Sequence, residues 1–338
     1  MQKDEVILSI CIPTYNRKLE LERTLGFLIP QCLGRKVEVI VSDNASEDGT
    51  NLFCIALGKE YNFFHFFRHE SNQGFAKNLI SVLGQGQGQY LWMLGDDEVL
   101  HEQAIELILC AIEKKKPSWL VCNFIKLNSR EGLVAYGDGE LRVKEDIETS
   151  SMDILLQNTG IWASFMSINI IQKEKFYLWL DYNDNKDSDY VCFNIALYAG
   201  RAEKCHILST PVIGRVKGSI NQHRFNKVST YLFSFFDPLD DLVKNGFLSV
   251  STRNYLAREM FLGMVSFLLL KAKVNGQALP SYKKCYAYHK NVLTFWLVVL
   301  PVMILPIKIS LGFIWVVSLT TPENISGRLK KLLKYLHG

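Results

Sequence analysis

Several features that would place the chain in a common functional class are missing from its sequence. Its eight cysteines are scattered singly, with no C-x-x-C pair. This pattern argues against a disulfide framework or a cysteine-bound zinc ion and favours reduced thiols in a cytosolic compartment. The formal net charge is only +4 and the basic residues gather only near the C-terminus, so no nucleic-acid partner is expected. None of the seven histidines lies at metal-ligand spacing from a cysteine or carboxylate, and no nucleophile elbow is present.

Long apolar runs are also scarce. At the N-terminus only about eight apolar residues lie between charged ones, which is too few for a signal peptide and predicts a first strand instead. A transmembrane helix needs about twenty apolar residues. The run Val292–Ile307 contains two prolines, and Lys308 separates it from a second run, Ile309–Thr321. These lengths favour a re-entrant or interfacial hairpin; one kinked span and a buried pair of helices are the alternatives.

The first 130 residues contain a regular alternation of short apolar runs and segments with helical spacing. The runs are apolar on both faces, which predicts an α/β fold with a mostly parallel sheet and helices on both of its faces. The predicted strands are Val6–Ile12, Val37–Val41, Phe63–Phe67, Tyr90–Leu94 and Ser118–Ile125, and the predicted helices are Lys18–Leu28, Phe75–Leu83 and Glu102–Lys115. A chain of 338 residues, 48% hydrophobic, has room for this domain and an accessory region.

Polar side chains follow three of the predicted strands at the points where the strands end. "IPTYNR" (Ile12–Arg17) follows the first and Asp43 the second, while in "LWMLGDDEVL" (Leu91–Leu100) the fourth runs into three adjacent carboxylates. Ligands bind beyond the carboxyl ends of strands in such sheets, so we expect these groups to line one binding site. Adjacent like charges are costly to bury, so the acidic cluster requires a cation. Taken alone, Asp43, Asn44 and Asp48 also fit ordinary turn and cap residues.

In order and spacing, the segments "SICIPTYNR", "VEVIVSDNASEDGT", "ESNQGFAKN" and "YLWMLGDDEVL" resemble those of the family 2 nucleotide-sugar glycosyltransferases, which have the GT-A fold. The sequence looks most like bacterial O-antigen and capsule transferases of the abequosyltransferase type. The resemblance implies a GT-A catalytic domain over residues 1–228, with a donor-binding half (1–130) and an acceptor half (131–228). Residues 229–338 then form a helical C-terminal region that we expect to associate with a membrane.

The resemblance also implies how a nucleotide diphosphate sugar binds. The turn after the first strand packs on the nucleoside, and Asp43 accepts a hydrogen bond from the base. Lys77, in "NQGFAKN", stands where a basic residue meets the donor, although a solvated lysine on a helix fits the same pattern. "GRVKGSIN" (Gly214–Asn221) resembles the segment that closes over the diphosphate, although surface loops rich in Arg and Lys are common. The implied donor-binding residues are Pro13, Thr14, Tyr15, Arg17, Asp43, Lys77, Asp96, Arg215, Lys217 and Ser219.

The acidic cluster is similar to the family's D-x-D motif, which holds a divalent cation between the donor phosphates. Asp96 and Asp97 supply the hard oxygen ligands that suit Mn²⁺ and Mg²⁺. The ion neutralises charge on the departing nucleoside diphosphate. Leu94 replaces the usual first aspartate, so we expect metal binding to depend more on the donor. Which of Asp96, Asp97 and Glu98 touches the ion is open, and an acidic helix entry is the alternative.

Direct displacement at the anomeric carbon needs a base for the acceptor hydroxyl proton. By resemblance Asp189, in "NKDSDYVCFNIALYAGR", takes this role at the start of a helix, where a carboxylate stays ionised. Asp187 is the rival base, Ser188 stands in place of the usual glutamate, and a helix N-cap is the structural alternative. Trp162, in "TGIWASFMSINI", matches the wall of the acceptor pocket and fits either a sugar-stacking or a core residue.

These assignments predict an inverting, metal-dependent hexosyl- or deoxyhexosyltransferase that extends a polyprenyl-diphosphate-linked glycan in surface polysaccharide synthesis. A basic cluster near the C-terminus would attract anionic lipid and places the protein at the cytoplasmic face of the bacterial inner membrane. Its members are Arg328, Lys330, Lys331 and Lys334. A catalytically silent nucleotide-sugar-binding or scaffold protein is the alternative, because the first aspartate is missing. Nucleotidyl transfer lacks support, since no glycine-rich phosphate loop follows the first strand and "GQGQG" (Gly84–Gly88) is predicted to be a helix-to-strand turn.

Overall fold

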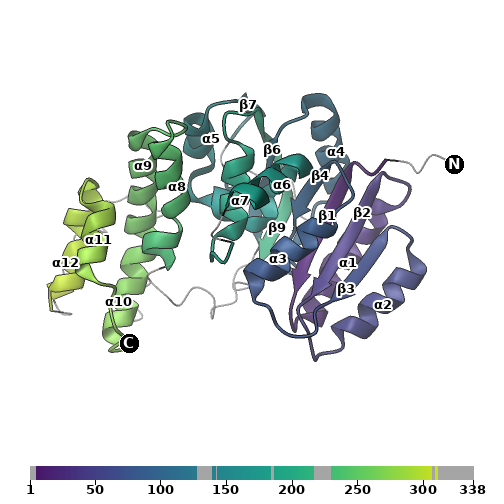
Figure 1. Cartoon of the computed structure of the whole chain (residues 1–338), viewed down its shortest axis with the longest axis horizontal. Helices are drawn as coiled ribbons and strands as arrows, with labels where there is room; N and C mark the ends of the chain where they lie inside the picture. The colour runs from purple at the N-terminus through teal and green to yellow at the C-terminus, as the bar shows by residue number, and fades with distance from the viewer. Residues whose placement is uncertain are drawn as a thin grey trace. The chain divides into compact units, whose positions relative to one another are not determined.

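The computed structural model describes residues 5–127, 139–141, 143–183, 186–216, 230–306 and 309–310. The chain divides into two compact units, Met1–Ile220 and Asn221–Gly338. The β-sheet belongs to the first unit, and the second is helical within its described residues (Figure 1). The functional division into a donor half, an acceptor half and a membrane-associated region remains a prediction.

The first unit is built on one sheet, which has nine strands among the described residues. These are β1 (Leu8–Thr14), β2 (Val37–Asp43), β3 (Phe64–Arg68), β4 (Tyr90–Met93), β5 (Val99–Leu100), β6 (Trp119–Leu127), β7 (Ile147–Thr149), β8 (Asn169–Gln172) and β9 (Cys205–Val216). Their spatial order is β3-β2-β1-β4-β8-β6-β9-β5, and β7 pairs with β9. The five strands predicted in the first 130 residues are β1, β2, β3, β4 and β6.

The sheet is parallel only in part, which corrects the prediction of a mostly parallel sheet. β3, β2, β1 and β4 form a parallel half, as expected, and β6 is parallel to β9. β8 runs antiparallel to both of its neighbours, β4 and β6, and β5 and β7 run antiparallel to β9. Ser167, just before β8, hydrogen-bonds to Gly95 and Glu98 beyond the end of β4. The chain therefore enters β8 at the carboxyl edge of the parallel half and runs back.

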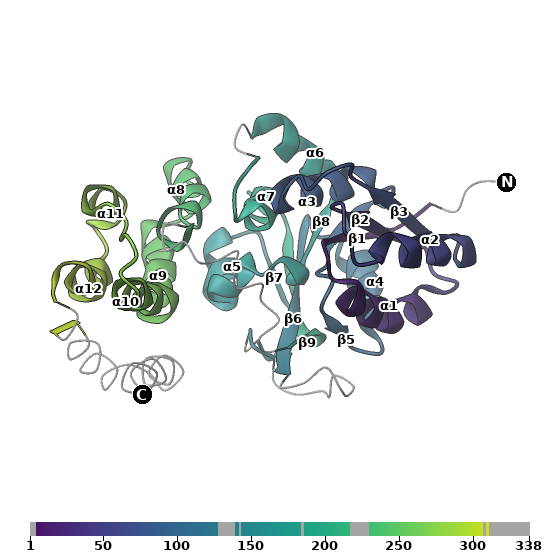
Figure 2. The ribbon, with the colours of Figure 1, turned by 90° about the horizontal axis from the view of Figure 1, so that it is seen from below.

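Helices pack around the sheet. They are α1 (Lys18–Cys32), α2 (Thr50–Glu60), α3 (Phe75–Gln85), α4 (Ala104–Lys115), α5 (Met152–Thr159), α6 (Lys173–Tyr182) and α7 (Val191–Ala199). Figure 2 shows α1 and α4 on one side of the sheet and α3 and α7 on the other. Every residue of β1, β2 and β4 is buried, as strands covered on both faces must be. The predicted helices are confirmed as α1, α3 and α4, whereas α2 was not predicted.

The glycine-rich segment Gly84–Gly88 leads from α3 into β4, as predicted, although its first two residues still belong to the helix. At Gly88 the chain passes so close to β1 that an added Cβ would lie 2.7 Å from the backbone nitrogen of Ser9. The Gly88 N–H donates a 2.7 Å hydrogen bond to the Ser9 hydroxyl, which donates in turn to the buried carboxylate of Glu38. The glycine is needed for this close packing, at the edge of the sheet opposite the acidic cluster.

The second unit contains short α-helices joined by π-helical turns. They are η3 (Thr230–Ser234), α8 (Asp237–Lys244), α9 (Val250–Met260), η4 (Phe261–Val265), α10 (Ser266–Val274), α11 (Tyr282–His289), η5 (Phe295–Val299) and α12 (Leu300–Ile304). The rings of Phe236, Phe261 and Phe295 pack around the buried imidazole of His289. Burial lowers the pKa of His289 to about 4. The unit therefore has its own aromatic core.

Among the described residues, no helix is both long enough and apolar enough to cross a bilayer. The first predicted apolar run forms η5 and α12, whose helical turns end before Pro306. Nearly all of the second run, Ile309–Thr321, and the whole terminal basic cluster lie outside the described residues.

Candidate active site

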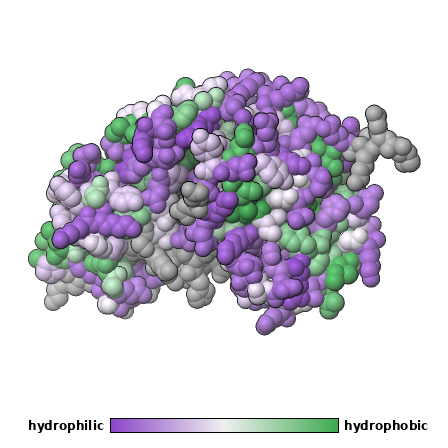
Figure 3. All heavy atoms as spheres, viewed as in Figure 1, coloured by the Kyte–Doolittle hydropathy of each residue, from purple (hydrophilic) through white to green (hydrophobic). Residues whose placement is uncertain are grey.

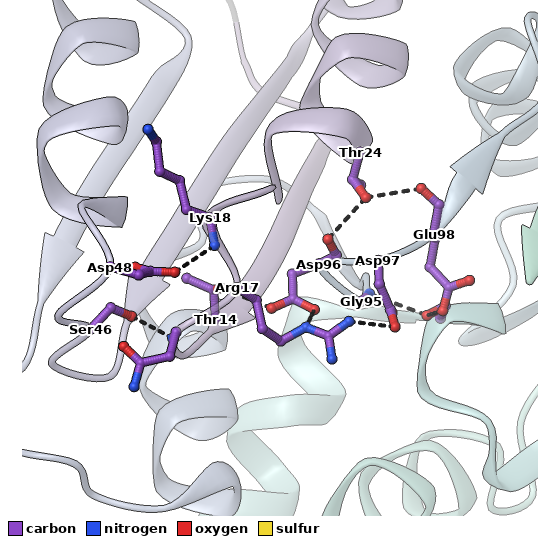
Figure 4. A network of polar contacts seen from close by, with 12 residues as sticks. Thr14, Arg17, Lys18, Thr24, Ser46, Asp48, Gly95, Asp96, Asp97 and Glu98 are labelled. Atoms are coloured by element: carbon purple, nitrogen blue, oxygen red, sulfur yellow. Dashed lines mark hydrogen bonds and ion pairs between the residues drawn. The ribbon is translucent and has the colours of Figure 1, made fainter. Parts of the chain in front are cut away.

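Arg17 joins the two aspartates that follow β4. It lies in the turn between β1 and α1, and the aspartates lie in the turn after β4. Its Nη2 donates a 2.6 Å hydrogen bond to Asp97 Oδ2, and its Nε lies 2.9 Å from Asp96 Oδ1 (Figure 4). In this structure, the cation that the acidic cluster requires is therefore a guanidinium.

The contacts of Arg17 with the aspartates are incomplete. Its buried Nε has no hydrogen-bond acceptor, because the 2.9 Å contact with Asp96 is an ion pair without hydrogen-bond geometry. The other oxygen of Asp96, Oδ2, accepts a 2.8 Å hydrogen bond from the hydroxyl of Thr14. Both oxygens of Asp96 are thus in contact with side chains, whereas Arg17 contacts Asp97 through Oδ2 alone.

Glu98 lies on the far side of Asp97 from Arg17 (Figure 4). Its Oε1 accepts a 2.8 Å hydrogen bond from the Ser167 hydroxyl, whose oxygen accepts another from the Gly95 N–H at 3.1 Å. On the other side of the turn, the Thr24 hydroxyl lies 3.0 and 2.9 Å from the backbone carbonyl oxygens of Asp96 and Glu98. Thr24 and Ser167 therefore fix the backbone that presents the two aspartates. Through its hydrogen bond with Ser167, Glu98 helps to hold this backbone in place.

Three carboxyl groups and one guanidinium share this turn, and burial opposes the ionisation of Asp96 and Glu98. Burial raises the pKa of Asp96 to about 7, although Arg17 opposes the shift. Burial, together with the charge of Asp97, raises the pKa of Glu98 to about 8. Burial alone would lower the pKa of the Arg17 guanidinium, but the neighbouring Asp96 and Asp97 carboxylates outweigh it and raise that pKa. A further cation placed beside these carboxylates would be stabilised.

The end of β2 carries a buried acceptor that lacks a donor. The side chain of Asp43 is fully buried, and its Oδ1 accepts a 2.9 Å hydrogen bond from the Ser46 N–H. Its Oδ2 has no hydrogen-bond partner, and the Arg68 Nε lies 3.5 Å away as a long ion pair. An unsatisfied buried carboxylate oxygen is costly, so it marks a place that an N–H group of a ligand would stabilise. This is the position predicted to meet the base.

Three other residues predicted to bind the donor differ in exposure. Pro13 is buried within β1, opposite Ser42 of β2. Tyr15, just beyond β1, is 42% exposed, as a side chain that stacks on a ligand must be. Lys77 is exposed in the first turn of α3. Its contact with the donor stays a prediction.

Sequence reasoning missed the residue that ties α3 to this edge, which is Asn78. Its side chain is buried, accepts a hydrogen bond from the Ser42 hydroxyl, and donates to the backbone oxygens of Ser42 and Thr14 at 3.2 and 3.4 Å. The signal was its place at the end of "NQGFAKN", on the apolar face of the predicted helix. Thr24, Arg68 and Ser167 were also missed, because isolated residues of these types carry no signal.

Trp162 is half-buried in the 3-10 turn η1 (Gly160–Ser164). Its ring packs edge-on against Phe124 at 5.2 Å, and the Lys126 ammonium lies 4.6 Å from the ring centre. The Arg215 guanidinium, on β9, lies 5.8 Å from the Trp162 ring and 5.2 Å from the Phe165 ring. Trp162 therefore already contacts a core ring and two cations, and its acceptor role stays a prediction.

Asp189 is exposed just before α7 and does not cap it. The helix begins at Val191 with Tyr190 at the N-cap, which corrects the N-cap alternative for Asp189. Asp187, the rival base, is exposed in the same segment. The structure leaves the choice between the two carboxylates open. Lys217 and Ser219 lie outside the described residues.

Asp96 and Asp97 supply some, but not all, of the ligands that a divalent cation needs. Nowhere in the described ranges do three or more His, Cys, Asp or Glu side chains gather as a complete metal site. Mg²⁺ and related ions are commonly held by one or two carboxylates together with substrate phosphates, which is what this pair offers. Within the described part of the chain, Asp97 Oδ1 makes no hydrogen bond or ion pair. The pair therefore fits such an ion, on condition that Arg17 yields the oxygens it contacts.

The part of the chain that contains this site is similar to a known family. Residues 9–168 match the family described as Glycosyl transferase family 2. The matched span runs from β1 to the turn before β8, so it includes Arg17, the two aspartates and Ser167.

Two curated relatives show the extent of the similarity. The abequosyltransferase RfbV of Salmonella typhimurium is 27% identical over 180 residues, which cover 51% of this chain and 54% of the relative. The GalNAc(5)-diNAcBac-PP-undecaprenol beta-1,3-glucosyltransferase of Campylobacter jejuni is 25% identical over 171 residues, with 50% and 54% covered. The chain thus spans about half the length of the curated relatives it matches.

A solved structure shares the fold. The mannosyltransferase PcManGT from Pyrobaculum calidifontis, solved in complex with GDP-Man and Mn²⁺, superposes with a TM-score of 0.53 at 14% sequence identity. The superposition covers 85% of this chain and 82% of that one. At this identity the similarity bears on the fold alone, and it confirms the GT-A type of α/β architecture.

Proposed function

We propose that this protein, which belongs to glycosyltransferase family 2 through residues 9–168, transfers a sugar from a nucleotide diphosphate sugar to an acceptor hydroxyl with inversion. The observation that carries the proposal is the set of unsatisfied groups at the carboxyl edge of the parallel strands. A buried carboxylate oxygen of Asp43 lacks a donor, and Arg17 has a buried N–H without an acceptor. A nucleotide diphosphate supplies both missing groups, as base N–H and phosphate oxygen.

In the proposed complex, Asp43 Oδ2 accepts a hydrogen bond from the base, and Tyr15 packs on the nucleoside. Arg17, Lys77 and Arg215 supply positive charge toward the diphosphate, and Lys217 and Ser219 are proposed to add further contacts to it. Arginine is suited to this role because its planar fork matches two phosphate oxygens at once.

Asp96 and Asp97 are the residues that would hold Mn²⁺ or Mg²⁺. When bound, such an ion supplies positive charge against the diphosphate as it departs. The protein's own part is to hold the two carboxylates still. The Thr14 hydroxyl fixes Asp96 through Oδ2, and Thr24 and Ser167 fix the backbone on either side of the turn.

We assign the role of general base to Asp189, with Asp187 as the rival. The acceptor oxygen forms a bond to the anomeric carbon while the bond from that carbon to the β-phosphate oxygen breaks. The hydroxyl proton passes to the carboxylate as the oxygen attacks. Attack from the side opposite the leaving diphosphate inverts the anomeric centre. The carboxylate of Asp189 is exposed, as a group that meets an acceptor must be.

We further propose a lipid-linked acceptor, because the second unit has a surface suited to an anionic membrane. Tyr282, Tyr286 and Trp296 form an exposed row with ring centres 6.0 and 5.7 Å apart. Apolar side chains also reach the surface over α12 (Figure 3), where Ile304 is exposed. Residues 260–322 contain six lysines and no aspartate or glutamate. Exposed aromatic rings and lysines are what an interfacial protein presents to anionic lipid.

Sedimentation with liposomes tests this membrane surface. The full-length protein is expected to sediment with vesicles that contain phosphatidylglycerol and to release at high salt, since the attraction is partly electrostatic. Replacing Tyr282, Tyr286 and Trp296 with serine is expected to weaken sedimentation. Replacing the exposed residues Leu52 and Ile55 of α2 is the control. A full-length protein that ignores such vesicles excludes the membrane surface and leaves the transferase proposal standing.

A panel of nucleotide diphosphate sugars, screened for thermal stabilisation with and without Mn²⁺, identifies the donor, since a ligand of the native state raises its melting temperature. Transfer from that donor is then compared in Asp97→Asn, Asp189→Asn and Asp187→Asn. We expect at least a hundredfold loss for the first two and retained donor binding for Asp189→Asn. A wild-type protein that binds a donor but neither transfers nor hydrolyses it would instead be the silent binding protein.

A further inference from the structure

We propose that the Arg17 guanidinium is a built-in counter-ion, which occupies the cation position of the acidic turn in the free protein and must leave it before a divalent ion binds. The inference rests on the proposed function, since it takes Asp96 and Asp97 as the residues that hold the ion. It gives Arg17 control over metal binding, in addition to contact with the donor.

The distances place the guanidinium between the two carboxylates. Its Nη2 contacts Asp97 Oδ2 at 2.6 Å and its Nε contacts Asp96 Oδ1 at 2.9 Å, so one planar cation spans both side chains. An ion held by both carboxylates would compete with Arg17 for Asp96 Oδ1, because the Thr14 hydroxyl already occupies the other oxygen of Asp96. Two cations beside the same carboxylates repel each other strongly where water is largely excluded. Arg17 and the ion therefore compete.

The side chain of Arg17 is free to exchange partners while its backbone stays in place. The Arg17 carbonyl oxygen accepts the first hydrogen bond of α1, from the Leu21 N–H at 2.9 Å, which anchors the main chain. The side chain is 18% exposed, and its buried Nε–H has no acceptor. A diphosphate offers a guanidinium the same two-oxygen geometry as a carboxylate, with more negative charge. Donor binding is therefore expected to draw Arg17 off Asp97.

The competition makes metal and donor binding depend on one another. Without donor, an ion must displace Arg17 and leave the guanidinium without its partners, so the metal alone binds weakly. With donor present, the phosphates take the guanidinium and free the carboxylates. The coupling is reciprocal, so the metal tightens donor binding by the same factor. Without donor, the positive charge that opposes metal binding is that of the Arg17 guanidinium.

The test is the affinity of the full-length protein for Mn²⁺ without donor, measured from the electron paramagnetic resonance of free Mn²⁺. Arg17→Gln removes the competing charge and is expected to tighten Mn²⁺ binding by about tenfold or more. The matched control is Lys18→Gln, which removes the same charge one residue away. The Lys18 ammonium points away from the aspartates (Figure 4), so its loss is expected to change the affinity by less than about twofold.

Two further variants make the result decisive. Arg17→Lys keeps a cation but cannot span both carboxylates, so it should bind Mn²⁺ about threefold tighter than the wild type, and it serves as the test if the glutamine variant does not fold. Asp97→Asn in each background reports whether the bound Mn²⁺ lies at the proposed site. Binding that is sensitive to Asp97 but not tightened in the Arg17 variants overturns this inference alone. Absence of Asp97-sensitive Mn²⁺ binding in every variant overturns the proposed metal site as well.

Discussion

The hydroxyl of Thr14, the last residue of β1, donates a 2.8 Å hydrogen bond to the buried carboxylate of Asp96 in the turn after β4. The two residues are 82 positions apart in the sequence. The hydrogen bond favours the ionised form of Asp96 and so opposes the effect of burial on its pKa. A residue at the end of β1 thus stabilises the charge of a carboxylate beyond the end of the neighbouring strand β4. Substitution of Thr14 tests this contribution.

Thr14→Val removes this hydrogen bond with little change of shape. We expect the free energy of unfolding to fall by about 1–2 kcal/mol, because the carboxylate of Asp96 loses its hydroxyl partner. Thr14→Ser keeps the hydroxyl and is expected to stay within about 0.5 kcal/mol of the wild type. Urea unfolding of the three proteins measures both values. Equal stability of the valine and serine variants would show that the hydrogen bond contributes nothing.

Because Glu98 has a raised pKa, we expect the free energy of unfolding to fall as the pH rises from neutral into mild alkali. Its pKa in the folded protein is raised to about 8, so the folded state holds a proton that the unfolded state has already lost, and stability falls as pH rises through about 8. Between pH 7 and 8.5 the wild type should lose about 1 kcal/mol relative to Glu98→Gln, measured by urea unfolding in EDTA. The window lies above the ordinary histidine pKa, so His289 does not contribute. Parallel pH profiles for the two proteins contradict the prediction.

Two glycines between the end of α3 and the start of β4, Gly84 and Gly88, should respond in opposite directions to alanine. At Gly88 the new Cβ would meet the Ser9 backbone at 2.7 Å, and we expect a loss of about 1–3 kcal/mol in unfolding free energy. At Gly84, near the end of α3, nothing lies within 4 Å of an added Cβ. Alanine there should stabilise the protein by about 0.5–1 kcal/mol. Thermal unfolding of the two variants provides the comparison, and a stable Gly88→Ala protein would refute the close packing against Ser9.

Asp43→Asn tests the base contact. Asparagine can keep the hydrogen bond to the Ser46 N–H but presents an amide N–H in place of Oδ2. Binding of the donor found in the panel should weaken about 10- to 100-fold, by calorimetry, while the protein stays folded. Asp48→Asn, in the same loop, is the control, since within the described residues Asp48 hydrogen-bonds only to Thr50 at the start of α2 and to the Lys18 N–H at the start of α1. Equal losses in both variants would mean that the loop, and not the Asp43 oxygen, matters.

The strands and helices with strong patterns were predictable from the sequence, and those with weak patterns were not. β1, β2, β4 and the helices α1, α3 and α4 follow their apolar periodicity closely. In α2 only Thr50 and Cys54 are buried, whereas Leu52 and Ile55 are exposed, so no amphipathic stripe marked it. The direction of β8 was also hidden, because an apolar run carries no sign of which way its strand runs in the sheet.

At the site, the sequence identified the groups that meet at the edge but not how they pair. Asp43, Asp96 and Asp97 were recognisable because charged residues directly follow buried strands. The pairing of Arg17 with the acidic turn depends on two loops 80 residues apart, and no local pattern encodes such a contact. The role of Ser167 was hidden for the same reason, since its partners lie 69 and 72 positions away.

The Ser167 bridge sets a rule for exchanging the segment before β8 between related proteins. Its hydroxyl joins the segment before β8 to the turn that carries the two aspartates. A chimaera that imports this segment from a related protein without a serine or threonine at position 167 would loosen the turn that presents Asp96 and Asp97. Grafts that retain the hydroxyl change the imported segment and keep that turn in place.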